Sequence, residues 1–378
     1  MSASSPEAAR SIAIIGTRGY PNYYGGFETA VRFLAPALAD DGWTVTVYGR
    51  KGGSDLTRGD GDPRVRVVET WGLETKALST LTFGLSAALH AFFAKPDVAI
   101  VMNVANGFWL PILRSRGIPT LLNVDGLEWT REKWGRAAKA VFKAGASLSA
   151  QWATRLVADS RHIASYWLKN FRRDSAFIPY GGVERLALPL PPGLEHRRYV
   201  LLVARLVEEN TISPFLEAAE ALAHDHDVVI VGSSGYASEL EGRVADLASR
   251  SSRVTWLGHV ADDDRLHALW QHCGAYFHGH SVGGTNPALV QAMFLGAPIV
   301  ARDTVYNREV LGDSRLGFVR PDTESIVVAI RETLSDSQKQ EEESVRARNR
   351  ARSDYSWSGV TSAYSSAATD LLASSRKR

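Results

Sequence analysis

Residues 16–29, GTRGYPNYYGGFET, follow the apolar run SIAII of residues 11–15 and precede AVRFLAPALAD, residues 30–40, whose apolar spacing predicts a helix. A strand that runs into a helix through such a corner is typical of parallel α/β folds. Glycine allows positive φ and a close approach of the backbone to a ligand, and the start of the helix offers free amides to an anion. We interpret the stretch as a loop at a ligand site, with a tightly packed structural corner as the alternative.

Short apolar runs that predict strands alternate with helix-length segments along most of the chain. They cover residues 11–16, 43–49, 65–69, 97–103, 119–125 and 155–159 in the first half, and 199–205, 227–233, 254–258, 275–280 and 298–302 in the second. This alternation predicts parallel sheets covered by helices on both faces. The predicted fold class is α/β, with two doubly wound, Rossmann-like domains and a ligand cleft between the carboxyl ends of their strands.

A proline-rich segment, LALPLPPGLEHRR at residues 186–198, separates the two series of strands and predicts a semi-rigid linker. We expect an N-terminal domain over residues 1–185 and a C-terminal domain over residues 199–355. Residues 356–378 have helical spacing and are expected to pack back on the N-terminal domain. Closure of the two domains about the linker would exclude water from the site.

The composition is that of a packed globular protein, with 45% hydrophobic and 22% charged residues in a chain of 378. The net charge of +2 is too small to indicate a nucleic-acid partner. Cys273 is the single cysteine, so no internal disulfide forms and a reducing, cytoplasmic location is expected. The first residues show no secretion signal, and the apolar segment 77–93 is shorter than a membrane span and predicts a buried helix.

A second glycine corner lies in HGHSVGGTNPALVQAMFLG, residues 278–296. Gly283 and Gly284 end a strand-to-helix turn, Asn286 is placed to cap the helix, and Pro287 suits its first turn. Free amides at that helix start suit phosphate oxygens. Neither corner matches GxGxxG or the P-loop lysine pattern, which disfavours an NAD-dependent oxidoreductase and P-loop nucleotide binding.

Three charged residues stand at or after strand ends. Arg205 ends the first strand of the second domain, where its guanidinium can clamp a diphosphate, with a surface arginine as the alternative. Asp125 is a candidate to orient or deprotonate a sugar hydroxyl, or else a helix cap for the segment near Thr130. Glu28 has the same ambiguity, because a glutamate in a first helical turn favours the helix dipole with or without a ligand.

The sequence indicates no metal site and no cofactor. Asp262, Asp263 and Asp264 satisfy the DxD pattern with which some transferases hold a metal-bound sugar nucleotide, but they directly precede a helix and are interpreted as its cap. The ten histidines form no HExxH or Cys/His cluster.

The segment 130–148 carries Arg136, Lys139 and Lys143 along one helical face. A basic amphipathic helix of this kind can lie on an anionic membrane surface. A solvated face without a membrane partner is the alternative.

Taken together, these motifs resemble the retaining GT-B glycosyltransferases of family 4. GTRGYPNYYGGFET and DGLEWTREKW are similar to the bacterial rhamnosyltransferase branch with its DUF1972-type N-terminal domain. The resemblance covers nearly the whole chain, because ADSRHIASYWLKNF, IPYGGVE, the Arg205 strand, IVGSSGYASEL, VTWLGHV and HGHSVGGTNPALVQAM occur in the family's order.

The resemblance implies transfer of a sugar from a nucleotide diphosphate to a hydroxyl, with retention and without a metal. In that branch the donor is typically dTDP-L-rhamnose, and the acceptor is typically a sugar on a polyprenyl diphosphate at the cytoplasmic membrane face, in polysaccharide assembly. Arg205 matches the family's diphosphate-binding arginine, Gln291 falls where the donor's ribose is held, and Asp125 is the nearest candidate for the usual crevice histidine. The matching phosphate loop consists of Gly283, Gly284, Thr285 and Asn286.

Three positions depart from the family pattern. Asn210 and Thr211 replace the lysine expected five or six residues after Arg205, and Asn210 is taken as a donor-binding residue in its place. Gly283 and Gln291 stand at the two glutamate positions of the EX7E motif. Losing a cation weakens the stabilisation of a departing diphosphate, whereas a glutamine still accepts a hydrogen bond from a ribose hydroxyl.

The expected mechanism places the donor on the second domain and the acceptor on the first. The acceptor-side residues are Gly25, Gly26, Glu28 and Asp125, with Tyr20, Tyr23, Tyr24 and Phe27 as apolar surface for sugar or lipid. The alternatives are a transferase for UDP-glucose, UDP-N-acetylglucosamine or GDP-mannose, a sugar-nucleotide epimerase, and a non-catalytic subunit that binds a nucleotide sugar.

Overall fold

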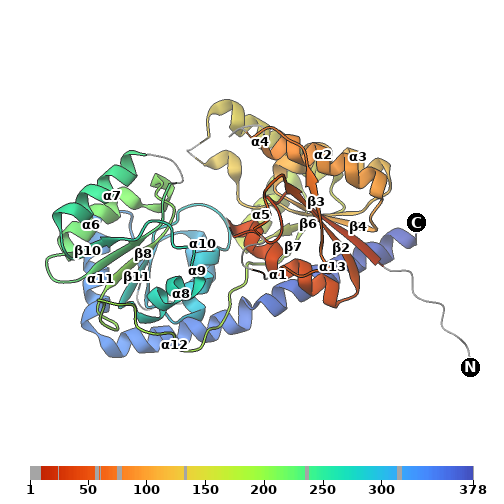
Figure 1. Cartoon of the computed structure of the whole chain (residues 1–378). Helices are drawn as coiled ribbons and strands as arrows, with labels where there is room; N and C mark the ends of the chain where they lie inside the picture. The colour runs from red at the N-terminus through yellow and green to blue at the C-terminus, as the bar shows by residue number, and fades with distance from the viewer. Residues whose placement is uncertain are drawn as a thin grey trace, which may run out of the picture. The chain divides into compact units, whose positions relative to one another are not determined.

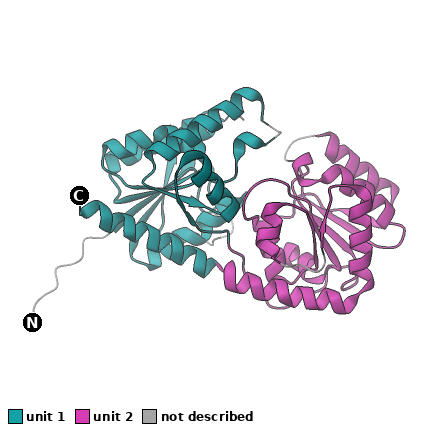
Figure 2. Cartoon of the chain, turned by 180° about the vertical axis from the view of Figure 1, so that it is seen from behind, with its two compact units in different colours: residues 1–180, 357–378 teal, residues 181–356 magenta. Residues whose placement is uncertain are grey.

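The chain forms two compact units in the computed structural model, which describes residues 10–23, 25–55, 59, 61–74, 79–131, 134–234, 238–312 and 317–377. The first unit comprises residues 1–180 together with 357–378, and the second comprises residues 181–356 (Figure 2). The chain therefore passes from one unit to the other twice, after Tyr180 and after Ser356.

The first unit is built on a parallel sheet. Among the described residues seven strands pair in the order β3-β2-β1-β4-β5-β6-β7 (Figure 1). They are β1 (Arg10–Ile15), β2 (Trp43–Arg50), β3 (Arg66–Thr70), β4 (Val98–Met102), β5 (Thr120–Asn123), β6 (Arg155–Ala158) and β7 (Ser175–Phe177). All five residues of β4 are buried, as expected for a strand whose two faces are covered.

Helices cover both faces of this sheet (Figure 1). They are α1 (Gly26–Asp40), α2 (Ser79–Ala94), α3 (Leu110–Ser115), α4 (Arg136–Trp152), α5 (Arg161–Phe171) and α13 (Trp357–Arg376), with the short 3-10 turns η1 (Val104–Trp109) and η2 (Glu128–Thr130). Trp357 of α13 stacks on Phe33 of α1 with ring centroids 4.5 Å apart. The last helix of the described chain thus completes the core of the unit that contains the first strand.

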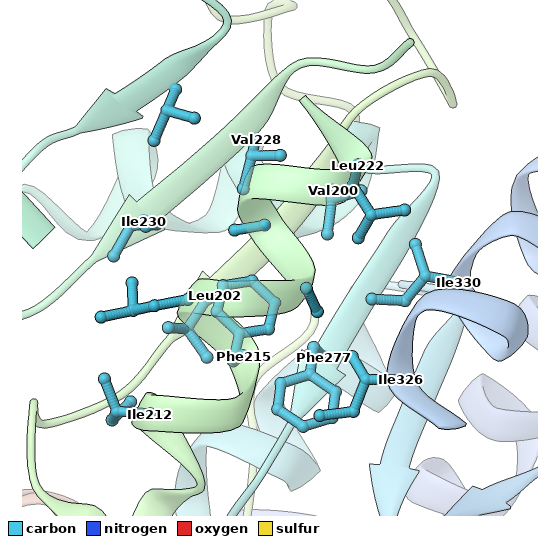
Figure 3. Close-up of a cluster of buried hydrophobic side chains, with 14 of the residues drawn as sticks. Val200, Leu202, Ile212, Phe215, Leu222, Val228, Ile230, Phe277, Ile326 and Ile330 are labelled. Carbon is cyan, nitrogen blue, oxygen red and sulfur yellow. The ribbon is translucent and has the colours of Figure 1, made fainter. Parts of the chain in front are cut away.

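The second unit repeats the architecture with a parallel sheet in the order β10-β9-β8-β11-β12-β13. Its strands are β8 (Val200–Val203), β9 (Val228–Val231), β10 (Val254–Trp256), β11 (Ala275–His278), β12 (Ile299–Arg302) and β13 (Phe318–Val319). Its helical elements are η3 (Glu208–Asn210), α6 (Ile212–Leu222), α7 (Glu239–Arg250), α8 (Asp263–His272), α9 (Pro287–Phe294), α10 (Val305–Leu311), α11 (Thr323–Ser335) and α12 (Ser337–Asp354). Phe215 of α6 stacks on Phe277 of β11 at 5.1 Å, within the buried cluster of Figure 3.

The predicted doubly wound α/β fold is confirmed, and each predicted apolar run contains a strand. The prediction missed β7 and β13, which have three and two residues and are too short to show a period. The helix expected to be buried at 77–93 is α2, which is buried on one face only, because Leu89 and Phe93 are 45% and 79% exposed. Within the described residues, no helix combines the length and the apolar character that crossing a bilayer requires.

The proline-rich segment 186–198 lies in the second unit and is bonded to α8. The backbone N–H of Leu188 donates to Gln271 Oε1 at 2.9 Å, and that of Arg197 donates to the carbonyl of His272 at 2.7 Å. These bonds tie both ends of the segment to α8 of the second unit.

In each unit the strand order reverses beside the first strand, between β1 and β4 and between β8 and β11. The loops at the carboxyl ends of two such strands run to opposite sides of the sheet. Ligands of doubly wound folds bind in the crevice that this divergence creates.

Trp357→Ala tests the contribution of α13 to the first unit. The indole is 8% exposed, and truncating a buried tryptophan costs about 3–5 kcal/mol. We expect urea unfolding followed by circular dichroism to show the transition of the first unit at a lower urea concentration. Leu186→Ala, at a side chain 91% exposed in the second unit, is the control and should leave the curve unchanged. Coincident curves for Trp357→Ala and the natural chain would contradict this packing.

Candidate active site

Glu28 ties the loop after β1 to α1, the helix that follows this loop. Gly16 leaves the strand with φ of 97°, a conformation that favours glycine. The backbone N–H of Arg18 donates to Glu28 Oε1 at 3.1 Å, and Glu28 lies in the first turn of α1 and is 8% exposed. Its carboxylate therefore shapes the loop, next to Gly25 and Gly26 at the start of α1. Tyr24 lies outside the described residues.

Asp125 stands just beyond β5 in a left-handed conformation, with φ of 58°. This conformation is uncommon for a non-glycine residue, although aspartate adopts it more readily than most. The backbone N–H of Asp125 donates to Asn123 Oδ1 at 2.9 Å, and its carboxylate accepts from Asn103 Nδ2 at 3.2 Å. Asp125 does not cap η2, which follows Leu127 without a side-chain cap bond, so the helix-cap alternative is wrong.

The side chain that fixes Asn123 comes from α13. Asn123 Nδ2 donates to the hydroxyl of Tyr364 at 2.7 Å, and both residues are almost fully buried. Burial raises the pKa of Tyr364, so the phenol stays protonated at neutral pH. A short hydrogen-bonded chain therefore runs from Tyr364 through Asn123 to the backbone of Asp125.

Tyr180 interacts electrostatically with the carboxylates at this edge of the sheet. Its pKa is raised well above the ordinary value, first by burial and then by the negative charges of Asp125 and Asp159, with a smaller contribution from Glu28. The acidic groups predicted at the end of β5 and the start of α1 thus act on one buried phenol. This edge combines carboxylates with neutral hydrogen-bonding groups, which suits hydroxyl-bearing ligands.

In the second unit, Asn210 shapes the loop that carries Arg205. The Arg205 side chain is exposed just beyond β8, and its carbonyl accepts from Asn210 Nδ2 at 2.8 Å. Asn210 is 4% exposed. The amide that replaces the family's lysine is therefore directed to the backbone, and it holds the turn from which Arg205 projects.

The loops after β8 and β11 are bonded together. Thr211 has φ of 60°, which is unusual for a β-branched residue. Its hydroxyl donates to the carbonyl of Gly279 at 2.6 Å and accepts from Arg302 Nη1 at 3.0 Å. Ser281 donates to the carbonyl of Glu209 through its backbone N–H at 3.0 Å and through its hydroxyl at 2.7 Å. These bonds place the Arg205 loop and the glycine corner beside one another.

The glycine corner ends in a capped helix, as predicted. Asn286 Oδ1 accepts from the backbone N–H of Ala288 at 3.0 Å, and Pro287 is the first residue of α9. Gly283 has φ of 106°. Thr285 is 4% exposed, while Gly283 and Gly284 are half-buried. Within α9, Pro287 has no N–H and the N–H groups of Ala288 and Val290 are bonded to Asn286, so an anion at this corner would be bound by the loop amides of residues 283–286.

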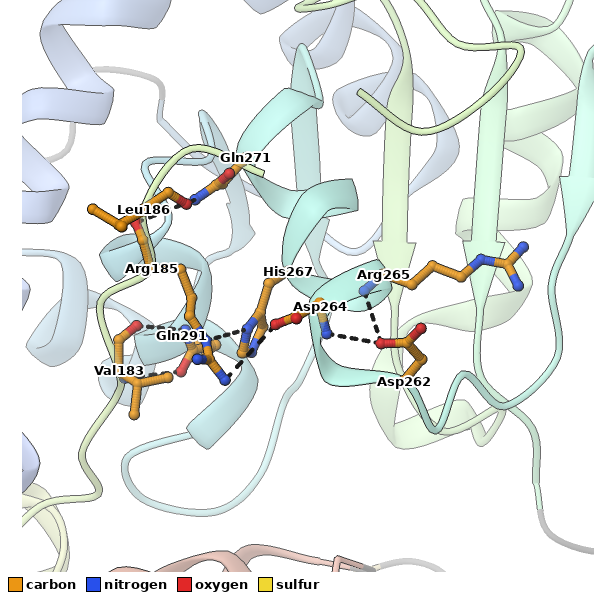
Figure 4. A network of polar contacts seen from close by, with 9 residues as sticks. All are labelled: Val183, Arg185, Leu186, Asp262, Asp264, Arg265, His267, Gln271 and Gln291. Carbon is orange, nitrogen blue, oxygen red and sulfur yellow. Dashed lines mark hydrogen bonds and ion pairs between the residues drawn. The ribbon is translucent and has the colours of Figure 1, made fainter. Parts of the chain in front are cut away.

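Gln291 is engaged with the chain just after the crossing from the first unit (Figure 4). Its Oε1 accepts from the backbone N–H of Val183 at 3.0 Å, and its Nε2 donates to the carbonyl of Val183 at 2.8 Å. Both ends of the amide are therefore occupied, and a bond to a ribose hydroxyl would have to share or displace one of them.

The acidic triplet is a helix cap, as predicted. Asp262 Oδ1 accepts from the backbone N–H groups of Asp264 at 3.0 Å and Arg265 at 3.2 Å (Figure 4). Asp264 also forms an ion pair with Arg185 at 3.8 Å. In the described part of the chain, no group of three His, Cys, Asp or Glu residues is arranged to hold a metal ion.

Both halves of the chain match models of known protein families. Residues 192–354 match the family model described as glycosyl transferases group 1, and residues 25–181 match that of a glycosyl transferase 4-like domain. The two models together identify the chain as a glycosyltransferase. The two matches together span most of its length.

Solved structures establish the fold of this glycosyltransferase as GT-B. Sucrose-phosphate synthase from Thermosynechococcus elongatus is 20% identical, with a TM-score of 0.80 over 97% of this chain and 100% of that chain. HepE from Anabaena, solved in complex with UDP, is 16% identical, with a TM-score of 0.72 over 96% and 100%. O-antigen chain mannosyltransferase B from Escherichia coli is 23% identical over 191 residues, and this match spans 50% of each protein.

Sequence reasoning missed several groups that shape the two sheet edges of this glycosyltransferase. They are Asn103, Asn123 and Tyr364 in the first unit, and His278 and Arg302 in the second. Position at the carboxyl end of a predicted strand marks Asn103, His278 and Arg302. No local signal marks Tyr364, because its partner lies 241 residues away.

Tyr364→Phe tests the chain of bonds that ends at Asp125. The substitution leaves the buried Asn123 amide without its acceptor, which costs about 1–3 kcal/mol. We expect the free energy of unfolding of the first unit, measured with urea, to fall by that amount. Tyr166→Phe, in α5 of the same unit, is the control, because its hydroxyl has no hydrogen-bond partner within the described residues. Equal effects of the two substitutions would argue against the Asn123 bond.

His278 predicts a dependence of stability on pH. Its side chain is fully buried, its Nδ1 lies 3.0 Å from the hydroxyl of Tyr276, and burial together with His280 lowers its pKa well below 6.5. Because the unfolded chain binds a proton near pH 6.5 and the folded chain does not, stability is full above that pH and falls as the pH is lowered through it. One such group costs about 1.4 kcal/mol between pH 7.5 and 5.5.

His278→Gln removes this titration while keeping a side chain that can hydrogen-bond Tyr276. We expect the stability difference between pH 7.5 and 5.5, from urea unfolding, to shrink by about 1.4 kcal/mol. His196 and His226, whose pKa values are also lowered by burial, contribute equally in both proteins. An unchanged difference would mean that His278 is not neutral and buried in solution.

Proposed function

We propose that this chain is a retaining glycosyltransferase that moves L-rhamnose from dTDP-L-rhamnose to a hydroxyl of a lipid-linked saccharide in cell-surface polysaccharide assembly. The observation that carries the proposal is the pairing of Arg205 with the glycine corner before α9, at the carboxyl ends of the neighbouring strands β8 and β11. One always-charged guanidinium and the backbone N–H groups of a glycine loop before a helix suit the diphosphate of a nucleotide sugar.

The choice of rhamnose rests on the motifs GTRGYPNYYGGFET and DGLEWTREKW. The relatives leave other donors open, since one is named a mannosyltransferase and another was solved with UDP. UDP-glucose, UDP-N-acetylglucosamine and GDP-mannose are therefore the competing donors to be tested.

The lipid-linked acceptor is supported by the basic character of α4. Arg136 and Lys143 are exposed on this helix and Lys139 is half-buried, while Gly145, Ala146 and Ser149 form its buried face. Such a helix is suited to the anionic surface of the cytoplasmic membrane leaflet. We propose peripheral contact of the protein with that surface.

In the proposed mechanism the donor diphosphate is held by Arg205 and the amides of residues 283–286. The acceptor hydroxyl, positioned near Glu28 and Asp125, attacks the anomeric carbon on the face from which the diphosphate departs. The electron pair of the broken carbon–oxygen bond passes to the diphosphate, which takes the hydroxyl proton. Arginine and amides stabilise the charge that develops on the leaving group, and the configuration of the sugar is retained.

A non-catalytic subunit that binds nucleotide sugars is the second candidate. It is favoured by two replacements, Asn210 for the family's lysine and Gln291 for its glutamate, whose side chains are both bonded to backbone groups. This candidate predicts donor binding without turnover. A sugar-nucleotide epimerase, in contrast, would convert the donor in the absence of any acceptor.

Thermal unfolding with each nucleotide sugar tests the donor assignment. A ligand at one hundred times its dissociation constant stabilises a protein by about 2.7 kcal/mol. We expect a selective rise in the unfolding temperature with dTDP-L-rhamnose, and a loss of that rise in Arg205→Ala, because the variant removes a charge-assisted contact with the diphosphate. Arg198→Ala is the control, since Arg198 is 77% exposed and pairs with Glu195.

Each outcome of this measurement separates the candidates. A selective shift with a UDP or GDP sugar would replace rhamnose as the donor, and no shift with any of them would contradict the proposed donor site. With the donor fixed, NMR of the product formed on a synthetic lipid-linked saccharide distinguishes transfer with retention from binding alone.

A further inference from the structure

A small pocket that opens to solvent lies at the carboxyl edge of the first unit's sheet, beside the loop after β1. Its walls include Thr17, Tyr48, Arg50, Thr70, Thr80 and Phe83. The pocket therefore joins the ends of β1, β2 and β3 to the first turns of α2. It lies outside the set of acceptor-side residues named above.

Arg50 is the cation of this pocket. It is the last residue of β2, and its side chain is only 16% exposed. Within the described part of the chain, its guanidinium contacts Glu74, whose Oε2 lies 3.5 Å from Nη1, and the ring of Phe83, whose centroid lies 5.0 Å away. A guanidinium has five N–H donors, so these two contacts leave most of them for a ligand.

The charges around Arg50 favour an additional anion. Burial lowers its pKa, and the positive charge of Arg18 lowers it further, whereas Glu74 and Glu28 act in the opposite direction. Glu74 is 67% exposed on its side chain, so its attraction is screened by water. Because the guanidinium is 16% exposed and its carboxylate partner is screened, the positive charge of Arg50 is only partly compensated.

The remaining walls supply neutral hydrogen-bonding groups. The hydroxyl of Thr70 donates to the carbonyl of Gly49 at 2.8 Å, and that of Tyr48 lies 3.0 Å from His90 Nδ1. Thr80 lies in the first turn of α2, a helix of 16 residues whose positive dipole end favours an anion. Because the hydroxyls of Thr70 and Tyr48 are already bonded within the chain, the groups left for an anion at this opening are Arg50 and the first turn of α2 with Thr80.

We propose that this pocket is an anion subsite, in which Arg50 binds a phosphate group of the acceptor. The identity of the ligand as an acceptor rests on the proposed function, because the donor diphosphate is there assigned to Arg205 in the other unit. The planar guanidinium matches phosphate oxygens bidentately. The phosphate belongs either to the diphosphate of a lipid-linked saccharide or to a soluble sugar phosphate.

Titration calorimetry with inorganic pyrophosphate tests the subsite. Arg205→Ala serves as the background, so that binding at the proposed donor site is weakened. Adding Arg50→Gln is expected to weaken the remaining binding at least tenfold, whereas Arg50→Lys, which keeps the charge, should lose less. Arg64→Gln is the matched control, because Arg64 is half-exposed and pairs with Asp40 and Asp62 outside the pocket.

Two further probes separate the sources of the phosphate. Farnesyl diphosphate represents a prenyl-linked acceptor, and glucose 6-phosphate represents a soluble one. The subsite is supported if one of these two probes binds Arg64→Gln but not Arg50→Gln. The probe that does so identifies the source of the phosphate. If pyrophosphate and both probes bind Arg50→Gln as well as they bind the control, or bind neither protein, the proposal is overturned.

The fold and the proposed function are checked separately in the same variants. Arg50→Gln in the natural chain should keep the unfolding temperature and its rise with a nucleotide sugar, because the donor contacts lie in the other unit. If Arg50→Gln unfolds early, Thr80→Val is the second variant, with an expected weakening of about threefold. If a nucleotide sugar raises the unfolding temperature but pyrophosphate binding does not depend on Arg50, the subsite is contradicted and the proposed function is not. If pyrophosphate binding depends on Arg50 but no nucleotide sugar raises the unfolding temperature, the proposed function alone is contradicted.

Discussion

Parallel strands that are buried on both faces leave one place where polar side chains can gather, the edge at which their carboxyl ends emerge. Both units obey this constraint. Arg50, Asn103 and Asp125 stand at or just beyond the ends of β2, β4 and β5, and Arg205 and Arg302 stand just beyond or at the ends of β8 and β12. These five residues depend on this sheet geometry for their position.

The loops at these edges are fixed mainly by side chains that bond to backbone groups. Glu28, Asn210 and Gln291 each look like ligand-binding residues from the sequence, and each is engaged with an amide or a carbonyl in the structure. Preorganising a loop in this way keeps its free amides in place without help from the ligand, which lowers the entropy lost on binding. Polar residues in such loops can therefore matter to a reaction without touching the substrate.

The strand pattern and the capped corner at Asn286 could be predicted from the sequence, because apolar runs and helix caps are local signals. The directions taken by Gln291 and Asn210 could not, since an amide serves a ribose or a backbone carbonyl equally well until the fold brings one of them near. Tyr364 and Arg50 were missed for another reason. Their roles come from neighbours that are distant in the chain, Asn123 for one and Phe83 for the other. The sequence therefore predicts whether a segment is a helix or a strand, but it does not predict which elements contact one another.

The position of α13 in the chain has a consequence for synthesis. The second unit is a continuous stretch of residues 181–356, whereas the first is completed only by residues that follow it. Domains generally begin to fold as they leave the ribosome, in the order of the chain. The earlier unit must therefore wait, with the surface that Trp357 and Tyr364 later cover still exposed to water, until the whole of the other unit has been translated. The unit whose synthesis begins first is therefore the last to be completed. A chaperone that protects nascent chains would have to cover the face of α1 and β5 for the longest time.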